Sequence, residues 1–171
     1  FVVVSKDVYL NNYHLLKDIK NGGILLISSD KTDEELNNLI NNDNKKEIIN
    51  KNIKVYIASL DELNKKYNLH GKINNIMCTY MFKIAGYGRN EIDAFKKLVT
   101  KTYSSKGNDV VENNINAIDE SLKYLEVIDN KIFTLTEDKK IVKNLTNEML
   151  HLRGNMMSVS DFIDHADGTF E

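Results

Sequence analysis

The chain has no proline and only one cysteine, Cys78, among its 171 residues. One cysteine excludes an internal disulfide, and it cannot supply the thiolates of an iron–sulfur cluster, which needs about four. No apolar run approaches the roughly 18 residues of a membrane span. The opening Phe-Val-Val-Val lacks the basic flank and cleavage site of a signal peptide. We therefore expect a cytoplasmic protein with no membrane partner and no cluster of its own.

The chain also lacks an excess of positive charge, because 23 Lys and Arg stand against 25 Asp and Glu and the formal net charge is -2. Such a balance gives no excess positive potential for a phosphate backbone, so we expect no nucleic-acid partner. The histidines show no i, i+4 pairing and no cysteines at ligand spacing, which argues against a metal site. They are His14, His70, His151 and His165.

Asparagine, lysine and isoleucine crowd the sequence, which we interpret as the nucleotide bias of an AT-rich genome. Disorder is not indicated, because 42% hydrophobic content is ordinary for a globular domain. The length is that of one domain. The chain starts at Phe1, inside a predicted strand and without an initiator methionine, so we expect a piece of a longer protein whose preceding strands lie outside it.

Short valine- and isoleucine-rich segments at 1–5, 23–28 and 53–58 predict strands of a parallel sheet. Between them, apolar spacing predicts a helix from Val8 that ends at Gly22-Gly23, and a capping box at Thr32–Glu35 opens a second helix. The polar stretch 41–52 reads as a loop or frayed helix. A second capping box at Ser59–Glu62 predicts a helix that runs to about His70.

Beyond Gly71 the pattern is helical. We predict helices over 73–84, 92–103 with Asn90 as cap, and 110–125, then a weak strand at 132–135, a helix over 138–152 and an irregular end from Gly154. Strands that alternate with helices imply right-handed crossovers. The expected fold is α/β: an incomplete Rossmann-like three-layer domain with a mostly parallel sheet and a helical C-terminal half.

Two sequence blocks in this helical half are distinctive. The first reads Lys-Ile-Asn-Asn-Ile-Met-Cys at 72–78, and the second reads Lys-Thr-Tyr-Ser-Ser-Lys-Gly at 101–107, followed by Val-Val-Glu-Asn-Asn-Ile-Asn-Ala-Ile-Asp at 110–119. In this order they resemble the "RINTIMQ" and "KTYGKKGEEVVEMNWAAVD" segments of the gamma-type domain of pyruvate:ferredoxin (flavodoxin) oxidoreductases. Cys78 stands where glutamine is common in that family.

The resemblance continues at both ends of the chain. Residues 5–23 are similar to the family's "HNPSYVGKYDLLEGIKEGG", and residues 154–162 and 167–170 to its "GDKLPVSAF" and "DGTFP". The resemblance implies a gamma-type domain over 1–127 that lacks its N-terminal part, glycine-rich "GSDGTVGANK" loop included. Residues 128–171 would be an extension leading to the family's "EKR" linker.

The resemblance implies part of an enzyme of anaerobic metabolism and electron transport. That enzyme converts pyruvate and coenzyme A to acetyl-CoA and carbon dioxide, and passes electrons to ferredoxin or flavodoxin. Thiamine diphosphate, magnesium and 4Fe-4S clusters would be held by other domains of the same polypeptide. The parent enzyme would be a homodimer. This piece would help to cover the active site and bind coenzyme A, and it would be inactive alone. The alternatives are a stand-alone Rossmann-like binding module and the pyruvate:NADP oxidoreductase fusion.

Four residues are candidates for a place near coenzyme A: Asn74, Cys78, Lys101 and Lys106. Asn74 and its neighbour Asn75 could instead cap or pack the helix that they start, and Cys78 could be an inert small hydrophobe. The two lysines suit phosphates, but a solvated helix end explains them equally well.

Other motifs carry no function. Residues 86–89, Gly-Tyr-Gly-Arg, follow a helix where a dinucleotide fingerprint requires a strand. Asp-Gly-Thr at 167–169 reads as a turn. No catalytic residue can be assigned.

Overall fold

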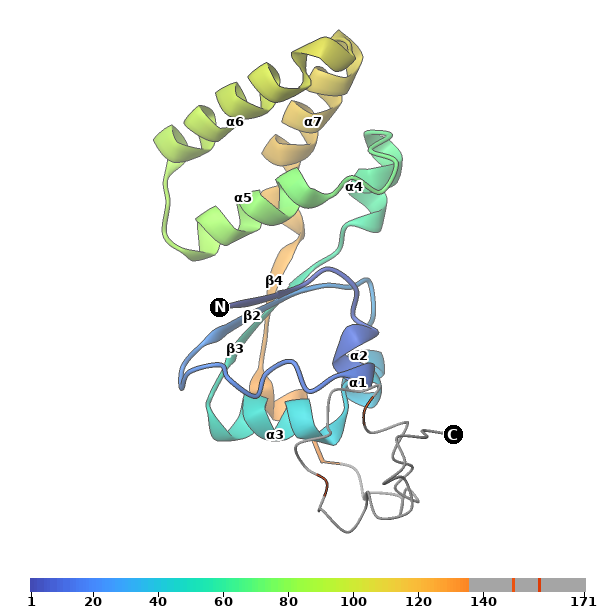
Figure 1. Ribbon diagram of the computed structural model, residues 1–171, viewed down its shortest axis with the longest axis vertical. Coiled ribbons are helices and arrows are strands. Elements are labelled where there is room, and N and C mark those ends of the chain that lie inside the picture. Colours follow the sequence, from blue (N-terminus) through green and yellow to red (C-terminus); the bar gives the residue numbers. More distant parts are fainter. Residues whose placement is uncertain (136–148, 150–156, 158–171) are drawn as a thin grey trace, which may run out of the picture. The chain divides into compact units, whose positions relative to one another are not determined.

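The computed structural model describes residues 1–135 together with Met149 and Met157. Within this part of the chain, one sheet is formed in the order β1-β2-β3-β4 (Figure 1). The strands are β1 Val2–Val4, β2 Ile24–Ser28, β3 Lys54–Ala58 and β4 Leu125–Ile128. The helices are α1 Tyr9–Asn12, α2 Asp33–Leu39, α3 Asn42–Asn50, α4 Asp61–Lys66, α5 Asn74–Ile84, α6 Arg89–Tyr103 and α7 Asn108–Ser121, with 3-10 turns at Ser104–Lys106, Leu122–Tyr124 and Asn130–Ile132.

The sheet is mostly parallel, as the sequence predicts. The Lys54 N–H donates to the Gly23 carbonyl at one end of β2 and β3, and the Ser29 N–H donates to the Ala58 carbonyl at the other end, so these two strands run in the same direction. In β2, Leu25, Leu26 and Ile27 are consecutive and fully buried. Burial of consecutive residues covers both faces of the strand, which is typical of a parallel sheet between helices. The predicted α/β class is confirmed.

The chain divides into two compact units. The first comprises Phe1–Leu25, Lys31–Val55 and Ile128–Glu171, and the second, here called the helical unit, comprises Leu26–Asp30 and Tyr56–Val127. The helical unit contains α4, α5, α6 and α7. Each unit is described by itself.

In the first unit, the capping box at Thr32 is confirmed. The Thr32 hydroxyl accepts from the Glu35 N–H at 3.3 Å, and the Glu35 carboxylate accepts from the Thr32 N–H at 2.9 Å. These bonds hold the pKa of Glu35 below its usual value. Of the two alternatives predicted for 41–52, the helix is the correct one, because Asn42–Asn50 is the helix α3, capped by the Asn41 side chain. Its buried face consists of Asn44, Lys45 and Ile48, so it lacks an apolar stripe.

The predicted helix from Val8 to Gly22 is also wrong, since only Tyr9–Asn12 is α-helical. The buried Asn44 side chain explains why. Its Oδ1 accepts from the Leu16 N–H at 3.1 Å, and its Nδ2 donates to the carbonyls of Leu10 and Tyr13 at 2.9 and 2.6 Å. Backbone groups that a continued helix would pair internally are therefore bonded to α3 instead.

In the helical unit, the predicted helices at 73–84 and 92–103 are confirmed as α5 and α6. Ile76, Met77 and Tyr80 of α5 pack into a core with Leu63 and Ala117, among other residues. The cap of α6 is Gly88 and not Asn90, because the Glu91 carboxylate accepts from the Gly88 N–H.

The second predicted capping box is wrong. The Ser59 hydroxyl is bonded to the Asp30 carboxylate, and α4 begins at Asp61 with no side-chain cap. This helix ends at Lys66 instead of reaching His70, because Asn68 and His70 take positive φ values of 47° and 52°.

The third predicted helix ends earlier than expected, at Ser121, and the last strand of the described residues is β4 at Leu125–Ile128 instead of 132–135. The buried Tyr80 hydroxyl donates to the Ser121 carbonyl at 2.7 Å, so this carbonyl is satisfied from outside the helix. Three residues later, the Tyr124 carbonyl accepts from the Ser59 N–H at the end of β3. The predicted helix over 138–152 and the irregular end from Gly154 lie outside the described residues, apart from Met149 and Met157.

Asn44 allows a test of the first unit. Replacing Asn44 by alanine removes three hydrogen bonds to the backbone, which we expect to cost about 3 kcal/mol of local stability. The Leu10 and Tyr13 carbonyls keep bonds from Asn41. Trypsin cleavage after Lys17 and Lys20 in the native full-length protein should accelerate about a hundredfold, because cleavage follows the population of the open segment. Asn50→Ala, at an exposed position of α3, is the matched control. Equal cleavage rates in the two variants would contradict the role of Asn44.

Candidate functional site

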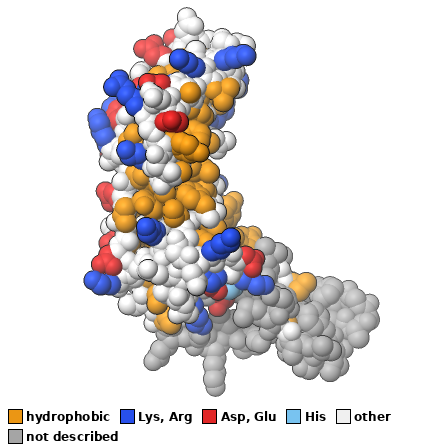
Figure 2. All heavy atoms as spheres, turned by 90° about the vertical axis from the view of Figure 1, so that its left-hand side faces the viewer, with side chains coloured by type: hydrophobic (Ala, Val, Ile, Leu, Met, Phe, Trp, Pro, Cys, Tyr) orange, Lys and Arg blue, Asp and Glu red, His pale blue; other side chains and the backbone are white. Residues whose placement is uncertain are grey.

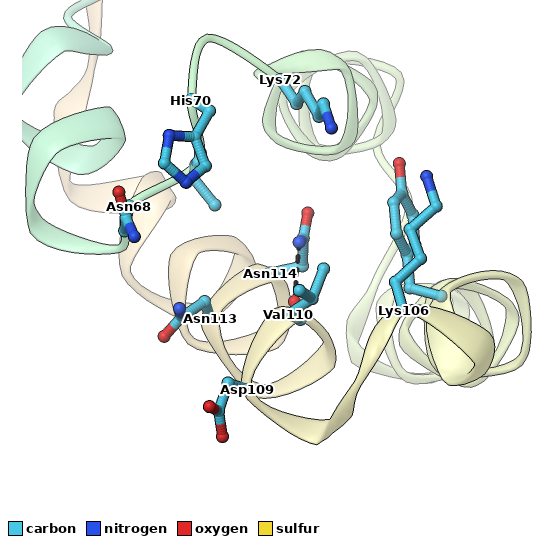
Figure 3. Close-up of a pocket in the computed structure, with 10 residues that line it drawn as sticks. Asn68, His70, Lys72, Lys106, Asp109, Val110, Asn113 and Asn114 are labelled. Carbon is cyan, nitrogen blue, oxygen red and sulfur yellow. Dashed lines mark hydrogen bonds between the residues drawn. The ribbon is translucent and has the colours of Figure 1, made fainter.

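A cavity of about 200 Å³ lies in the helical unit, between the turn at 68–72 and the junction of α6 with α7 (Figure 3). Both segments that line it combine basic and amide side chains. The lining residues are Asn68, Leu69, His70, Lys72, Tyr103, Lys106, Asp109, Val110, Asn113 and Asn114.

The turn at 68–72 has an unusual backbone conformation. Asn68, His70 and Gly71 all have positive φ values, and Gly71, at 77°, occupies a region that glycine adopts without steric cost. Asn64 holds the turn in place: its Oδ1 accepts from the Gly71 N–H at 2.8 Å, and its carbonyl accepts from the Leu69 N–H at 3.0 Å. Lys72 follows directly, so its backbone position is fixed.

The opposite side of the cavity is formed where α6 passes into α7. Lys106 ends the 3-10 turn Ser104–Lys106, and Gly107 after it has φ 101°, which disfavours any residue with a Cβ. The Lys106 ammonium lies 5.0 Å from the centre of the Tyr103 ring. Contacts of this kind between a cation and a ring are attractive by about 0.5–1 kcal/mol at exposed sites, so Tyr103 orients the lysine.

An amide relay joins α5 to α7 beside the cavity. The Asn75 Nδ2 donates to the Asn114 Oδ1 at 2.9 Å, and the Asn114 Nδ2 donates to the Val110 carbonyl at 2.8 Å. Asn114 is buried, and both of its polar atoms are bonded. Asn75 thus packs the helix pair instead of capping α5, whose N-cap, Ile73, makes no side-chain cap bond.

The charges at the cavity are unbalanced. Within the described residues, neither Lys72 nor Lys106 has a carboxylate in ion-pair contact, although Lys66 and Lys96 of the same unit contact Glu120 and Asp119. Lys72 and Lys106 both line the cavity, whereas Figure 3 shows the Asp109 carboxylate pointing away from the other labelled side chains. This side of the cavity is therefore positive.

Of the four residues that the sequence places near coenzyme A, Lys106 lines this cavity. Asn74 is exposed at the first residue of α5, Cys78 is a half-buried free thiol on the same helix, and Lys101 is exposed in the last turn of α6. Sequence reasoning missed Lys72, His70 and Tyr103. The signal that could have found two of them was available, because Lys72 and Tyr103 belong to the two distinctive blocks 72–78 and 101–119.

Among the described residues, no group of three or more His, Cys, Asp and Glu side chains could hold a metal ion. No helix in this part of the chain is both long and apolar enough to cross a membrane. Figure 2 shows hydrophobic side chains gathered together on the described part of one face, with basic and acidic side chains around them.

A carboxylate fixes the end of α4, from which the turn at 68–72 departs. Glu120 of α7 accepts from the Lys66 ammonium at 2.8 and 2.6 Å, and also from the hydroxyls of Tyr67 and Tyr124. The bonds from Lys66 and then Tyr67 lower the pKa of Glu120 to about 2. The bond to Glu120 in turn raises the pKa of Tyr67.

Comparison with known proteins identifies the family. Residues 1–124 match the family described as pyruvate ferredoxin/flavodoxin oxidoreductase. The chain belongs to this family. The resemblance seen in the sequence is confirmed. The match includes every residue of the two distinctive blocks, 72–78 and 101–119, that meet at the cavity.

Relatives in this family are much longer than the chain. It is 31% identical to the pyruvate:ferredoxin oxidoreductase of Moorella thermoacetica over 95% of the chain, which corresponds to 15% of that protein. It is 27% identical to the pyruvate-flavodoxin oxidoreductase of Klebsiella pneumoniae over 99% of the chain, or 16% of that protein. The chain thus spans about a sixth of these relatives.

The fold is similar to that of a solved subunit. The pyruvate oxidoreductase subunit PORC of Thermotoga maritima superposes with a TM-score of 0.57 at 17% identity, over 75% of this chain and 65% of that subunit. At this identity the similarity establishes the fold.

The low pKa of Glu120 predicts a pH-dependent contribution to stability. The folded-state pKa of about 2 lies below the usual 4.5, so the stabilisation is fully present above about pH 4.5 and is lost as the pH falls toward 2. Hydrogen exchange of residues 61–72 should therefore be faster in Glu120→Gln than in the wild type near neutral pH. This difference in exchange rate should become smaller as the pH is lowered to about 3. Glu112→Gln, exposed on α7, should show no such trend. A difference between Glu120→Gln and the wild type that is constant with pH would contradict the account.

Proposed function

We propose that the chain is the gamma-type segment of an enzyme that oxidatively decarboxylates pyruvate. Pyruvate and coenzyme A yield acetyl-CoA, carbon dioxide, a proton and two electrons, and the electrons pass to ferredoxin or flavodoxin. The observation that carries this proposal is the family match over residues 1–124. The names of the Moorella and Klebsiella relatives support the same substrate and acceptors.

The cofactors of this reaction are assigned to other parts of the polypeptide. One cysteine does not fit a 4Fe-4S cluster, which takes about four thiolates, so no electron-transfer step is routed through this chain. Thiamine diphosphate with magnesium supplies the carbanion chemistry in enzymes that use it. The proposed contribution of this chain is to help cover the active site and bind coenzyme A. We further propose a cytoplasmic homodimer, with residues 1–127 as the gamma-type part and 128–171 as the extension.

The residues proposed near coenzyme A are Asn74, Cys78, Lys101 and Lys106. Lys106 has the strongest support, because it lines the cavity and is in ion-pair contact with no carboxylate of the described residues. Lys101 precedes it by five positions, in the exposed last turn of α6. Two ammonium groups at this helix end suit the phosphates of coenzyme A, since charge-assisted bonds to phosphate are about twice as strong as neutral ones.

The reaction itself can be tested with the full-length protein. It should reduce ferredoxin only when pyruvate and coenzyme A are both present, because the proposed reaction uses both. The measurement is ferredoxin reduction under anaerobic conditions with each substrate omitted in turn. Strong preference for 2-oxoglutarate over pyruvate would contradict the proposal.

The role of the lysines is tested by kinetics. Lys106→Gln should raise the KM for coenzyme A by about tenfold with little change in kcat, because a lost phosphate contact weakens substrate and transition state alike. Lys101→Gln should act in the same direction. Lys97→Gln removes an exposed lysine of α6 that does not line the cavity and is the matched control. If Lys106→Gln has the same KM as Lys97→Gln, the assignment of Lys106 is wrong.

A further inference from the structure

We infer that Asn21 is a site of spontaneous deamidation, and that the hydrogen bond from the Gly22 N–H to the Lys51 carbonyl restrains this modification in the folded protein. The chain contains one Asn-Gly pair, at 21–22. The inference concerns the first unit and a reaction with water alone. It therefore does not rest on the proposed pyruvate reaction, and it needs no cofactor.

The modification is an attack of the backbone on the preceding side chain. The Gly22 nitrogen loses its proton and attacks Cγ, the amide carbon of the Asn21 side chain. A C–N bond forms, the bond from Cγ to the side-chain nitrogen breaks, and ammonia leaves behind a succinimide ring. Water then opens the ring at either carbonyl, which gives aspartate or isoaspartate at position 21. Glycine permits the close approach that this attack needs, because it has no Cβ.

The surroundings of Asn21 leave room for this attack. Asn21 and Gly22 are both exposed, and a Cβ placed on Gly22 would meet no atom within 4 Å. Among the described residues, the Asn21 side-chain amide has no hydrogen-bond partner, so it is free to rotate toward Gly22. Water reaches the pair, and side-chain packing does not protect it.

Backbone hydrogen bonds are what oppose the reaction. The Gly22 N–H donates to the Lys51 carbonyl at 2.7 Å. The nitrogen of a succinimide carries no hydrogen, so this bond must break before the ring can form. Two further bonds close the same turn: the Gly23 N–H donates to the Lys20 carbonyl at 2.9 Å, and the Lys54 N–H donates to the Gly23 carbonyl at 2.8 Å. Deamidation therefore requires local opening of the turn.

The acceptor of the restraining bond is held in place by its own side chain. Lys51 is the C-cap residue of α3. Its ammonium group contacts the Glu47 carboxylate at 2.7 Å and donates to the Lys17 carbonyl at 2.7 Å. The Lys51 side chain thus ties the end of α3 to the segment that leads into the turn. Loosening these contacts should raise the fraction of molecules in which the turn is open.

The two products differ in their effect on the turn. In the aspartate product the backbone is unchanged, so the Gly22 N–H can donate to Lys51 again. In the isoaspartate product the main chain runs through the former side chain, which lengthens it by one carbon and displaces the Gly22 N–H. The isoaspartate form therefore loses the bond to Lys51, and the turn before β2 stays open.

The experiment incubates the full-length protein in heavy-oxygen water at mildly alkaline pH, where the attacking nitrogen loses its proton more readily. Peptide mass spectrometry follows position 21, and incorporated heavy oxygen marks a ring that water opened during the incubation. Deamidation should be at least about tenfold slower in the native protein than in urea, because each backbone bond lowers the open fraction about fivefold. Equal rates in the two states, or no reaction in either, would overturn the inference.

Substitutions test the role of the Lys51 side chain. Lys51→Met should accelerate native deamidation about fivefold, and exchange of the Gly22 amide hydrogen by the same factor, because both follow the open turn. Lys46→Met, at an exposed position of α3, is the matched control and should change neither rate.

Circular dichroism shows whether each variant is folded, and Glu47→Gln, which weakens the contact with Lys51, should act in the same direction as Lys51→Met. The inference is wrong if Gly22 exchange accelerates in these variants while deamidation stays at the rate of Lys46→Met, or if neither rate changes. Because neither measurement requires turnover, loss of the proposed pyruvate activity would leave this test intact.

Discussion

The hydrogen bond from the buried Tyr80 hydroxyl to the Ser121 carbonyl, 2.7 Å long, sets the arrangement of the helical unit. Burial of this hydroxyl, together with the nearby Tyr124, raises the pKa of Tyr80, so the group stays a neutral donor. The bond joins the middle of α5 to the last residue of α7, just before the chain turns into β4. The cavity depends on this pairing, because Lys72 precedes α5 and Lys106 precedes α7.

Much of the fold could be predicted because apolar spacing reflects burial. The pattern of Ile76, Met77 and Tyr80 predicted α5, and these residues do enter the core. The same logic failed where polar side chains carry the structure. For α3 the sequence could not decide between a loop and a frayed helix, because the buried face of this helix contains Asn44 and Lys45. The opposite error occurred at Leu16 and Ile19, whose spacing suggested a helix. Both residues are buried, but they lie in turns, and the Leu16 N–H donates to the Asn44 side chain.

The site was predicted less well than the fold, because its residues come from separate segments. Lys106 was identified from its place beside a helix start. Lys72 could not be identified in this way, because it reaches the cavity only through the packing of α5 on α7. The left-handed conformations of Asn68 and His70, which shape one side of the cavity, leave no clear sequence signal in residues other than glycine. The sequence blocks that indicate the family are thus also the blocks that meet at the cavity, with Lys72 in one and Tyr103, Lys106 and Asn114 in the other.

The most direct measurement is a crystal structure of the full-length protein grown with coenzyme A. The account predicts coenzyme A density in contact with the Lys106 ammonium group, and the Tyr80 hydroxyl bonded to the Ser121 carbonyl. A map in which Lys106 contacts a carboxylate instead of coenzyme A, or in which the Tyr80 hydroxyl is not bonded to the Ser121 carbonyl, would contradict it.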